Sequence, residues 1–394
     1  MKIFHLSDLH IGLKLINRDL REDQEYILNQ IIQKAKEEKP DAILIAGDIY
    51  DKAVPSAEAV EVFDHFIGNL RTAVPESVVM MISGNHDSAP RVNCFRSVLT
   101  HQRIHMIGMP PQTEEDHIEK VVLQDEYGSV NFYLLPFVKP SMVKLIVGTD
   151  ENGNNLSYNE TIHRLLDREE IDETQRNILV SHQFYLPVGE NAEEVERMDS
   201  EIRTVGNIDQ VSADILQKFD YAALGHIHKP WIDDRSPMAY AGALEPIDRN
   251  DEGPHGYIRG VLNESETKID FVPFASRSYI TLNVPVAPEM TMRQLAEQVK
   301  ALMGQNGRQN MFQIAISGFR DVDFELDERM LMRLGRVLAV HDHSVPDYDF
   351  QRIYDENKDN IIGMYIRHIS EMEISDDLKA KALCYGMKAF YQTK

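Results

Sequence analysis

Residues 2–12 of this chain read KIFHLSDLHIG, an apolar run that ends abruptly in an Asp and a His. Two later stretches repeat this design: residues 42–51 read AILIAGDIYD, and residues 78–87 read VVMMISGNHD. A short apolar run bounded by polar residues is typical of a buried β-strand. The three runs therefore predict strands at residues 2–6, 42–46 and 78–82, each with polar side chains just beyond its carboxyl end.

The segments between these strands predict helices. Residues 18–38 and 56–69 carry apolar side chains at helical spacing, and Pro40 closes the first segment, whereas Pro55 and Ser56 open the second. An alternation of strands and helices predicts an α/β fold, in which helices cover the faces of a sheet. Further strands are expected at residues 130–135, 177–180, 221–224, 257–262 and 268–273.

The chain is long enough for more than one domain, because its 394 residues exceed the size at which a single core usually stops growing. The pattern changes near Ser276, where a strand at residues 279–284, a helix at 290–303 and a strand at 312–317 follow one another. We expect a first domain at residues 1–275, a smaller α/β domain at residues 276–350, and C-terminal helices within residues 351–394.

Composition indicates a cytoplasmic protein that does not enter a membrane. No apolar run approaches the roughly 20 residues needed to cross a bilayer. Asp8 and His10 stand where a signal peptide would carry its apolar stretch. The two cysteines, Cys94 and Cys384, lie far apart in the sequence and are expected to be reduced thiols.

The charge balance argues against a nucleic-acid partner when it is taken alone. The chain has 41 basic and 64 acidic residues, a formal net charge of −23, whereas affinity for DNA comes mainly from Lys and Arg. Net charge is not local charge, however. A pair of divalent ions would add about four positive charges inside a cleft, and a basic partner subunit could add more.

Polar motifs follow five of the expected strands, and the last two of these are Ser181-His182 and Gly225-His226-Ile227-His228. Ligands of open α/β sheets bind at the carboxyl ends of the strands, so we expect all five motifs to meet at one rim. The candidate site residues are Asp8, His10, Asp48, Asn85, His86, Asp87, His182, His226 and His228.

These residue types suit a pair of metal ions. Hard divalent ions such as Mn²⁺ prefer oxygen ligands and accept imidazole nitrogen. Asp48 follows a glycine, which suits a close approach to two ions, and Asn85 offers a neutral carbonyl oxygen. Two ions about 3.5–4 Å apart can hold an attacking hydroxide and the phosphate oxygens together. The sequence therefore predicts a di-metal phosphoesterase, although each motif alone is common in ordinary turns.

The ordered series D-x-H, G-D-x-x-D, G-N-H-D, a strand-end His and G-H-x-H resembles the calcineurin-like metallophosphoesterase superfamily. More narrowly, LSDLHIG, ISGNHDS, NFYLLPF and YAALGHIHKP are similar to its double-strand-break repair nucleases. The resemblance covers roughly residues 1–230. It implies a β-sandwich flanked by helices, a capping α/β domain and C-terminal helices.

The resemblance also implies the ligand sets. One metal ion would be held by Asp8, His10, Asp48 and His228; the second would be held by Asp48, Asn85, His182 and His226, with Asp48 bridging the two.

His86 would protonate the leaving sugar oxygen or stabilise the transition state, with Asp87 orienting its ring. The alternative is that His86 only binds phosphate. Asp51 would shape the surroundings of the metal ions without binding them.

The implied function is a DNA exonuclease and endonuclease subunit, acting on double-strand ends and on single-strand or hairpin DNA in repair and recombination. It would work as a homodimer with an SMC-like coiled-coil ATPase, docked through the C-terminal helices, unless these helices pack on their own domain. Basic residues near the motifs are candidates for phosphate contacts: Arg91, Arg96, Lys139, Lys144, Lys229 and Arg249. A phosphodiesterase or phosphatase acting on small molecules or phosphoproteins, and an assembly protein with a structural metal centre, remain alternatives.

Overall fold

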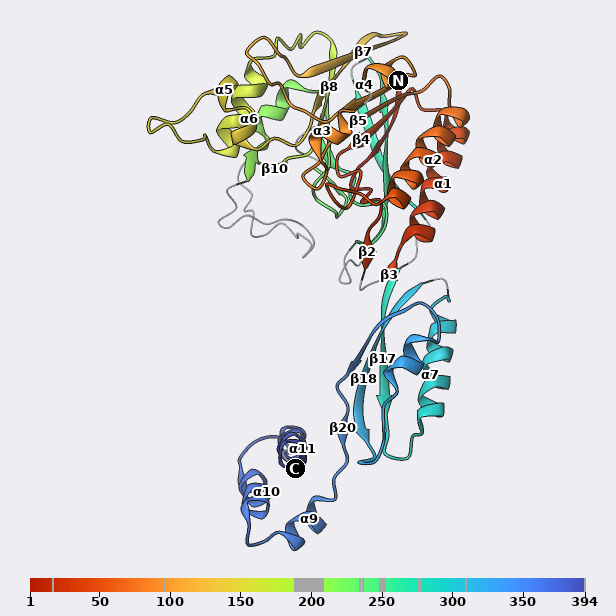
Figure 1. The fold of residues 1–394 in the computed structure, drawn as a ribbon, viewed down its shortest axis with the longest axis vertical. Helices are drawn as coiled ribbons and strands as arrows, with labels where there is room; N and C mark the ends of the chain where they lie inside the picture. The colour runs from red at the N-terminus through yellow and green to blue at the C-terminus, as the bar shows by residue number, and fades with distance from the viewer. Residues whose placement is uncertain are drawn as a thin grey trace. The chain divides into compact units, whose positions relative to one another are not determined.

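The computed structural model describes residues 1–15, 18–94, 96–187, 209–233, 235, 237–247, 253–264, 266–274, 278–308 and 310–392. The chain divides into two compact units, Met1–Ser276 and Arg277–Lys394 (Figure 1). The expected capping domain and C-terminal helices thus lie in one unit. Among the described residues, no helix is long and apolar enough to cross a membrane.

The first unit is built on two six-stranded sheets. The first sheet has the order β16 (Thr267–Pro273), β15 (Gly256–Leu262), β1 (Lys2–Leu6), β4 (Ala42–Ala46), β5 (Val78–Ile82), β6 (Ile104–Ile107). The second has the order β13 (Trp231–Ile232), β14 (Met238–Tyr240), β12 (Tyr221–Leu224), β9 (Arg176–Ser181), β8 (Gly128–Leu135), β7 (Glu119–Asp125). Strands β1, β4, β5 and β6 run parallel, as do β8, β9, β12 and β14, so each set ends at one edge of its sheet.

The sheets face each other across a core to which alternate residues of each strand contribute. In β4, Leu44 packs toward the second sheet, whereas Ile43 and Ile45 pack toward helices. In β8, Phe132 packs toward the first sheet and Tyr133 toward the helices of the other side. This alternation follows from the two-residue period of a strand, and it explains why the strands read as continuous apolar runs.

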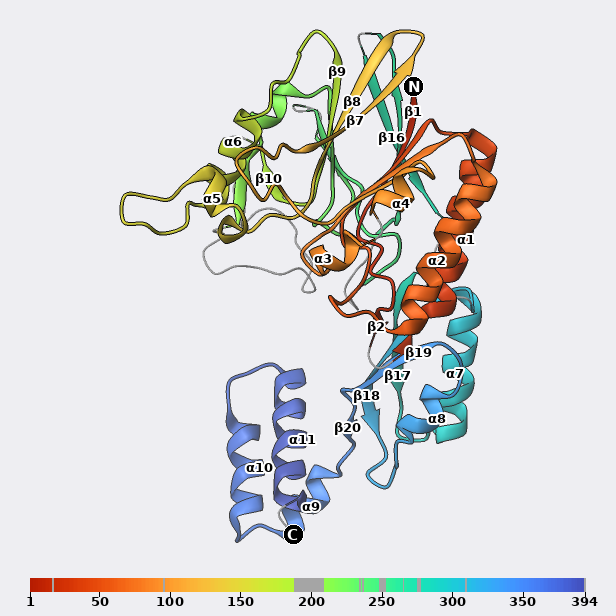
Figure 2. The same ribbon diagram turned by 45° about the horizontal axis from the view of Figure 1, so that its top comes forward.

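Helices cover both outer faces (Figures 1 and 2). On the first sheet lie α1 (Arg21–Glu38) and α2 (Ala57–Ala73); on the second lie α5 (Lys144–Val147) and α6 (Tyr158–Asp167). The predicted α/β sandwich flanked by helices is confirmed. Shorter elements complete the unit: β2 (Lys14–Leu15), β3 (Arg18–Asp19), α3 (Ala89–Val92), α4 (Arg96–Thr100), η1 (Pro140–Met142), β10 (Phe184–Leu186), β11 (Gln210–Ser212) and η2 (Ala213–Lys218).

The helix limits follow the sequence signals, with two corrections. The hydroxyl of Ser56 accepts a hydrogen bond from the Ala59 N–H and caps α2, and α1 ends at Lys39, whose φ of 51° precedes Pro40. The expected start of α1 at residue 18 is wrong, because β3 pairs there with β2. Helix α2 also continues beyond the expected residue 69 to Ala73.

The second unit contains a small sheet and a helical end. Strands β17 (Tyr279–Val286), β18 (Met311–Arg320) and β19 (Val337–Asp342) lie in this order, β20 (Val345–Pro346) pairs with β18, and α7 (Met292–Gln305) and α8 (Glu328–Met332) share the sheet's apolar core. Helices α9 (Phe350–Glu356), α10 (Ile361–Glu371) and α11 (Asp376–Gln392) follow and form a separate apolar cluster.

Candidate metal centre

The backbone hydrogen bonds between neighbouring strands extend into the polar motifs that follow these strands. Beyond β1 and β4, the N–H of Asp8 donates to the Gly47 carbonyl at 3.1 Å, and the N–H of His10 donates to the Asp48 carbonyl at 3.0 Å. His182, directly after β9, joins the two sheets because its Nδ1 lies 2.6 Å from the Ala46 carbonyl. The motifs therefore meet at one rim, as the sequence predicts.

Three motif glycines allow this close approach. A Cβ on Gly47 or Gly225 would collide with the His182 ring, and a Cβ on Gly84 would collide with Asp48. Only a residue without a side chain fits at these places. The site therefore requires a glycine in each of the motifs G-D, G-N-H-D and G-H-x-H, because a side chain there would push its groups apart.

The backbone at the site is strained. Asp8, His10, Asp48 and His226 have φ values of 51°, 41°, 48° and 93°. Such left-handed conformations cost on the order of 1–3 kcal/mol each and persist only where surrounding contacts fix them. Here the fixing contacts include the Asp8 carboxylate, which accepts the His226 N–H at 3.1 Å.

The first ligand cluster contains Asp8, His10, Asp48 and His228. One ligand atom of each lies within 4.8 Å of the others, and all four residues are buried. The Nε2 atoms of His10 and His228 face each other at 3.3 Å, and His228 Nε2 lies 3.8 Å from Asp8 Oδ1. These are the four residues that the sequence assigned to one metal ion.

The second cluster is centred on Asn85. Its Oδ1 lies 3.0 Å from His182 Nε2 and 2.9 Å from His226 Nδ1, and His182 Nε2 lies 3.2 Å from Asp48 Oδ2. Because a carbonyl only accepts, His182 must donate to Ala46 from Nδ1, which leaves Nε2 as the nitrogen that faces Asn85 and Asp48. Asp48 thus touches both clusters.

Burial dominates the electrostatics of the two clusters. It raises the pKa of Asp8 to about 7 and lowers the pKa of His10 to about 4. Burial opposes the charge on His182 as well, but the carboxylates of Asp48 and Asp8 raise its pKa to about 9. Among the described residues, the ion pairs of Asp8 and Asp48 are all with histidines, not with Lys or Arg. Buried carboxylates beside inward-facing imidazole nitrogens fit a pair of divalent cations.

His86 lies at the edge of this site. Its backbone N–H donates to Asp48 Oδ1 at 2.8 Å, and its ring packs edge-on against His10 with 4.9 Å between centroids. Its Nδ1 lies 3.1 Å from the Asp51 carbonyl, to which it donates. The Nε2 atom is therefore the ring position left to exchange a proton.

Asp87 forms different hydrogen bonds from those expected. Its carboxylate accepts hydrogen bonds from the N–H groups of Ile49, Tyr50 and Gly84 at 3.0, 2.9 and 2.9 Å. The prediction that Asp87 orients the His86 ring is wrong, because the Asp51 carbonyl holds that ring and both oxygens of Asp87 are directed to the backbone. Asp87 instead fastens the loop carrying Asp48 to the loop carrying Asn85.

Two residues near the site were not predicted. Phe137 stacks on the His226 ring with centroids 6.3 Å apart and an angle of 21°, so it forms a wall of the second cluster. The side chain of Gln24 in α1 bonds to the loop of Asp8 and His10. Phe137 lies in the quoted NFYLLPF stretch, but nothing in the local sequence of Gln24 indicates its contact.

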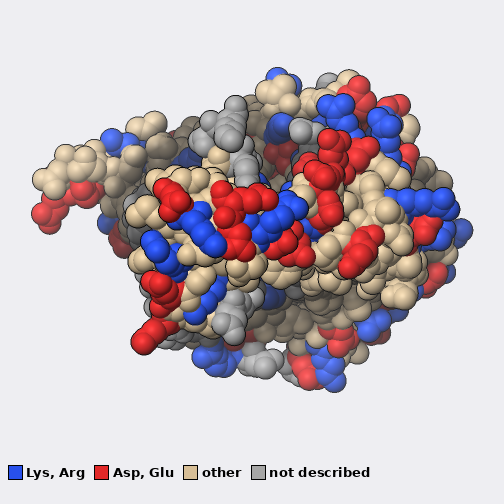
Figure 3. Space-filling view, turned by 90° about the horizontal axis from the view of Figure 1, so that it is seen from below, with Lys and Arg blue, Asp and Glu red and all other residues tan. Residues whose placement is uncertain are grey.

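Two of the basic candidates have partners within the chain, and two are exposed. Arg96 pairs with Glu119, Lys144 donates to the Gly153 carbonyl, and Arg91 and Lys139 are exposed. On the face shown in Figure 3, Lys and Arg are interspersed with Asp and Glu. Lys229 is half-buried, and Arg249 lies outside the described residues.

Comparison with a known family agrees with this geometry. The sequence profile described as calcineurin-like phosphoesterase matches residues 1–230. The structure is similar to TT1561 of Thermus thermophilus, with 12% identity and a TM-score of 0.38 over 68% of this chain and 98% of that one. It is also similar to a dimetal phosphatase from Danio rerio, with 12% identity and a TM-score of 0.34 over 68% of this chain and 98% of that one.

The glycine requirement can be tested at Gly84. We expect Gly84→Ala to weaken Mn²⁺ binding by about 10-fold or more, since displaced ligand supports typically cost 10–100-fold. Gly68 in α2 is the control, because a Cβ there meets no atom within 4 Å, and Gly68→Ala should keep the affinity while stabilising the helix by about 0.5–1 kcal/mol. Isothermal titration calorimetry measures the Mn²⁺ affinity of both variants. A Gly84→Ala variant with the affinity of the parent chain would refute the requirement for glycine.

The buried carboxylate predicts a pH dependence in the metal-free protein. Burial raises the pKa of Asp8 from its usual 3.8 to about 7, so the folded state holds a proton that the unfolded state releases. The stability contributed by this group is therefore lost as the pH rises from about 4 to about 7. In EDTA, Asp8→Asn should raise the melting temperature relative to the parent chain, by an amount that grows over this range and then levels off. With added Mn²⁺ the parent chain, and not Asp8→Asn, should have the higher melting temperature. A melting difference that does not depend on pH contradicts this account.

Proposed function

Since this chain belongs to the calcineurin-like phosphoesterase family, we propose that it is a metal-dependent phosphodiesterase whose substrate is DNA. The observation that carries the proposal is the buried double cluster around Asp48, with the His86 ring at its edge. Resemblance of the motifs to SbcD, the nuclease subunit of the bacterial SbcCD complex, supports the choice of substrate.

Asp8, His10, Asp48 and His228 would hold one divalent ion, and Asp48, Asn85, His182 and His226 would hold the other. Mn²⁺ suits this mixture of oxygen and imidazole donors. When bound, the two ions supply Lewis acidity and lower the pKa of a water that attacks phosphorus. Phe137 beside His226 limits the space around the second ion.

His86 supplies the proton in the proposed reaction. As the P–O bond to the leaving sugar breaks, that oxygen takes the electron pair and receives the proton of His86 Nε2. The Asp51 carbonyl orients the ring for this transfer by accepting from Nδ1. A positioned acid of this kind contributes about 10²–10⁴-fold in rate.

The proposal includes exonuclease and endonuclease action on DNA ends, hairpins and single strands. The protein would act in the cytoplasm as a homodimer, bound to an SMC-like ATPase that resembles SbcC. The second unit, residues 277–394, adds substantial structure beyond the catalytic unit. That addition supports a partnered nuclease. A phosphatase acting on small molecules or phosphoproteins is the second candidate, because the same donor set would also serve a phosphomonoester.

The C-terminal helices offer a surface for the ATPase. In α10, Ile361 and Met364 are 68% and 57% exposed; in α11, Leu378 and Tyr385, which lie two turns apart, are 54% and 59% exposed. Apolar side chains at helical spacing on a solvent-facing surface suit docking on another helix or a coiled coil.

The substrate proposal is tested by comparing the hydrolysis of linear duplex DNA, cyclic nucleotides and phosphopeptides in Mn²⁺. We expect DNA to be the preferred substrate and His86→Ala to lower its cleavage about 10²–10⁴-fold with Mn²⁺ binding retained. His101, an exposed histidine, is the control, and His101→Ala should leave cleavage unchanged. Faster turnover of phosphopeptides or cyclic nucleotides would assign the chain to the second candidate, and undiminished cleavage by His86→Ala would remove its role as the acid.

The docking proposal is tested with a coexpressed SMC-like ATPase from the same genome. We expect Met364→Glu and Tyr385→Glu to reduce co-purification at least about tenfold, since a buried unpaired charge costs several kcal/mol. Leu145, 83% exposed in the first unit, gives the control variant Leu145→Glu, which should bind normally. Full binding by both helix variants would mean that these helices serve their own unit.

A further inference from the structure

Gln24 is a buried polar residue of α1 that contacts the metal-binding loop. Its side chain is 5% exposed. Its Oε1 accepts the Gly12 N–H at 2.9 Å, and its Nε2 donates to the His10 carbonyl at 2.7 Å. A longer contact of 3.5 Å joins Nε2 to the Leu9 carbonyl. One amide thus bonds to both sides of the turn that follows Asp8.

This turn is held from two directions. On one side, the N–H groups of Asp8 and His10 donate to the carbonyls of Gly47 and Asp48. On the other side, the carbonyls of the turn face Gln24. Because Asp8 and His10 both have left-handed φ angles, the turn would relax if either set of bonds were removed.

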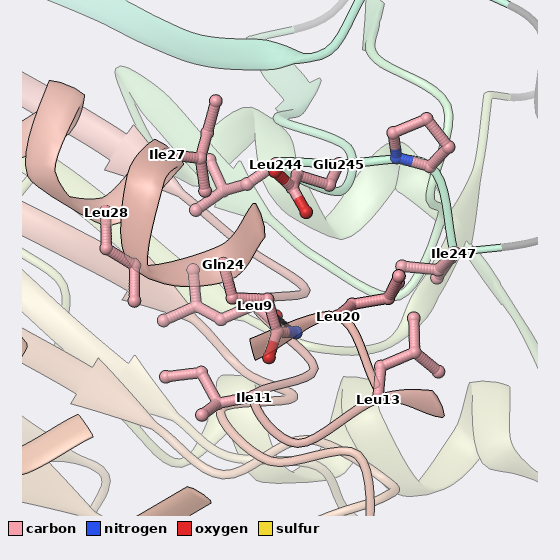
Figure 4. A pocket seen from close by; sticks show the side chains of 11 residues that line it. Leu9, Ile11, Leu13, Leu20, Gln24, Ile27, Leu28, Leu244, Glu245 and Ile247 are labelled. Carbon is pink, nitrogen blue, oxygen red and sulfur yellow. Dashed lines mark hydrogen bonds between the residues drawn. The ribbon is translucent and has the colours of Figure 1, made fainter. Parts of the chain in front are cut away.

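The surroundings of Gln24 strengthen these bonds. Figure 4 shows the side chain projecting among Leu9, Leu20 and Leu244. The cavity there has a volume of about 10 Å³, room for about one water molecule. Hydrogen bonds in such an apolar setting are stronger than in water, so water is a poor substitute for the amide.

We infer that Gln24 is a positioning residue that sets the metal affinity of the cluster of Asp8, His10, Asp48 and His228. Among the described residues, the side chain of Gln24 hydrogen-bonds only to backbone atoms, so it acts by holding the backbone of the loop that presents Asp8 and His10. The inference rests on the metal centre of the proposed function, but it does not depend on DNA being the substrate.

The test is Gln24→Leu in the full chain. We expect titration calorimetry to show one of the two Mn²⁺ affinities reduced about 10–100-fold, the usual effect of removing a support of a ligand. The Mn²⁺ concentration for half-maximal hydrolysis of bis(p-nitrophenyl) phosphate should rise by a similar factor. The rate at saturating Mn²⁺ should recover to near the parent value, whereas the metal-free melting temperature should fall, since leucine leaves the part-buried Gly12 N–H and the buried His10 carbonyl without the amide that bonds them.

Gln33→Leu is the matched control, because Gln33 lies on the same helix, is exposed, and bonds only to Glu37 among the described residues. It should alter neither affinity nor rate. Gln24→Asn carries the test if the leucine variant does not fold, because its amide is one methylene shorter and cannot span both His10 and Gly12. Unchanged Mn²⁺ affinity in a folded Gln24 variant overturns the inference. A parent chain that binds Mn²⁺ but leaves DNA intact would overturn the DNA proposal alone, and one that binds no Mn²⁺ would overturn both.

Discussion

The structure of the site depends on the burial of two carboxylates, Asp8 and Asp48, side by side among imidazole rings. A buried carboxylate is costly unless it is paired, and here two of the partners, His10 and His228, are themselves reluctant to carry charge, whereas His182 is held charged by the carboxylates. Burial raises the pKa of Asp8, whereas His182 draws the pKa of Asp48 below its usual range despite burial. Divalent cations would relieve the cost of burying both carboxylates, since they neutralise the carboxylates and accept the imidazole lone pairs. The metal-free arrangement is therefore one that only the rest of the fold can hold in place.

The two sheets supply that restraint. The strands β4, β5, β9 and β12 are buried along their whole length, and candidate ligands follow closely after each of them. The hydrogen bond from His182 to Ala46 ties the second sheet to the first at the site. Asp87 then fastens two loops of the first sheet together through three backbone N–H groups. Several of these restraints act directly beside left-handed backbone: Ala46 precedes Gly47, and Ile49 follows Asp48. The cost of the strained conformations is thus offset by contacts a few residues away.

The sequence predicts the strands and the meeting of the polar motifs at one rim well, for a specific physical reason, whereas the two ligand sets are what the family resemblance implies. A strand buried on both faces must read as an apolar run, and the polar residue that ends it must lie at the sheet edge, so Asp8, Asp48 and His226 could be placed from their neighbours alone. Asp87 could not, because its partners Ile49 and Tyr50 belong to another loop and bond through backbone atoms that no side-chain pattern reveals. Gln24 was missed similarly: within α1 it looks like any polar residue of an amphipathic helix. The start of α1 was misplaced because the hairpin of β2 and β3 depends on pairing over a few residues, which periodicity does not detect. The roles of the nine site residues in metal binding and proton transfer stay predictions.

The remaining conflict is between a net charge of −23 and a polyanionic substrate. At physiological salt the Debye length is about 8 Å, so acidic residues on distant surfaces scarcely act on a phosphate in the site. Two divalent ions inside the buried cluster would dominate the field there. The face drawn in Figure 3 carries basic side chains interspersed with acidic ones, and over the whole chain the 64 acidic residues outnumber the 41 basic ones. We infer that a nuclease built this way gains little affinity from its own surface, because duplex binding depends on many phosphate contacts by Lys and Arg. Under the proposed function, those contacts would have to come from a partner. The net charge of −23 is therefore compatible with DNA as the substrate only if the chain acts within an assembly.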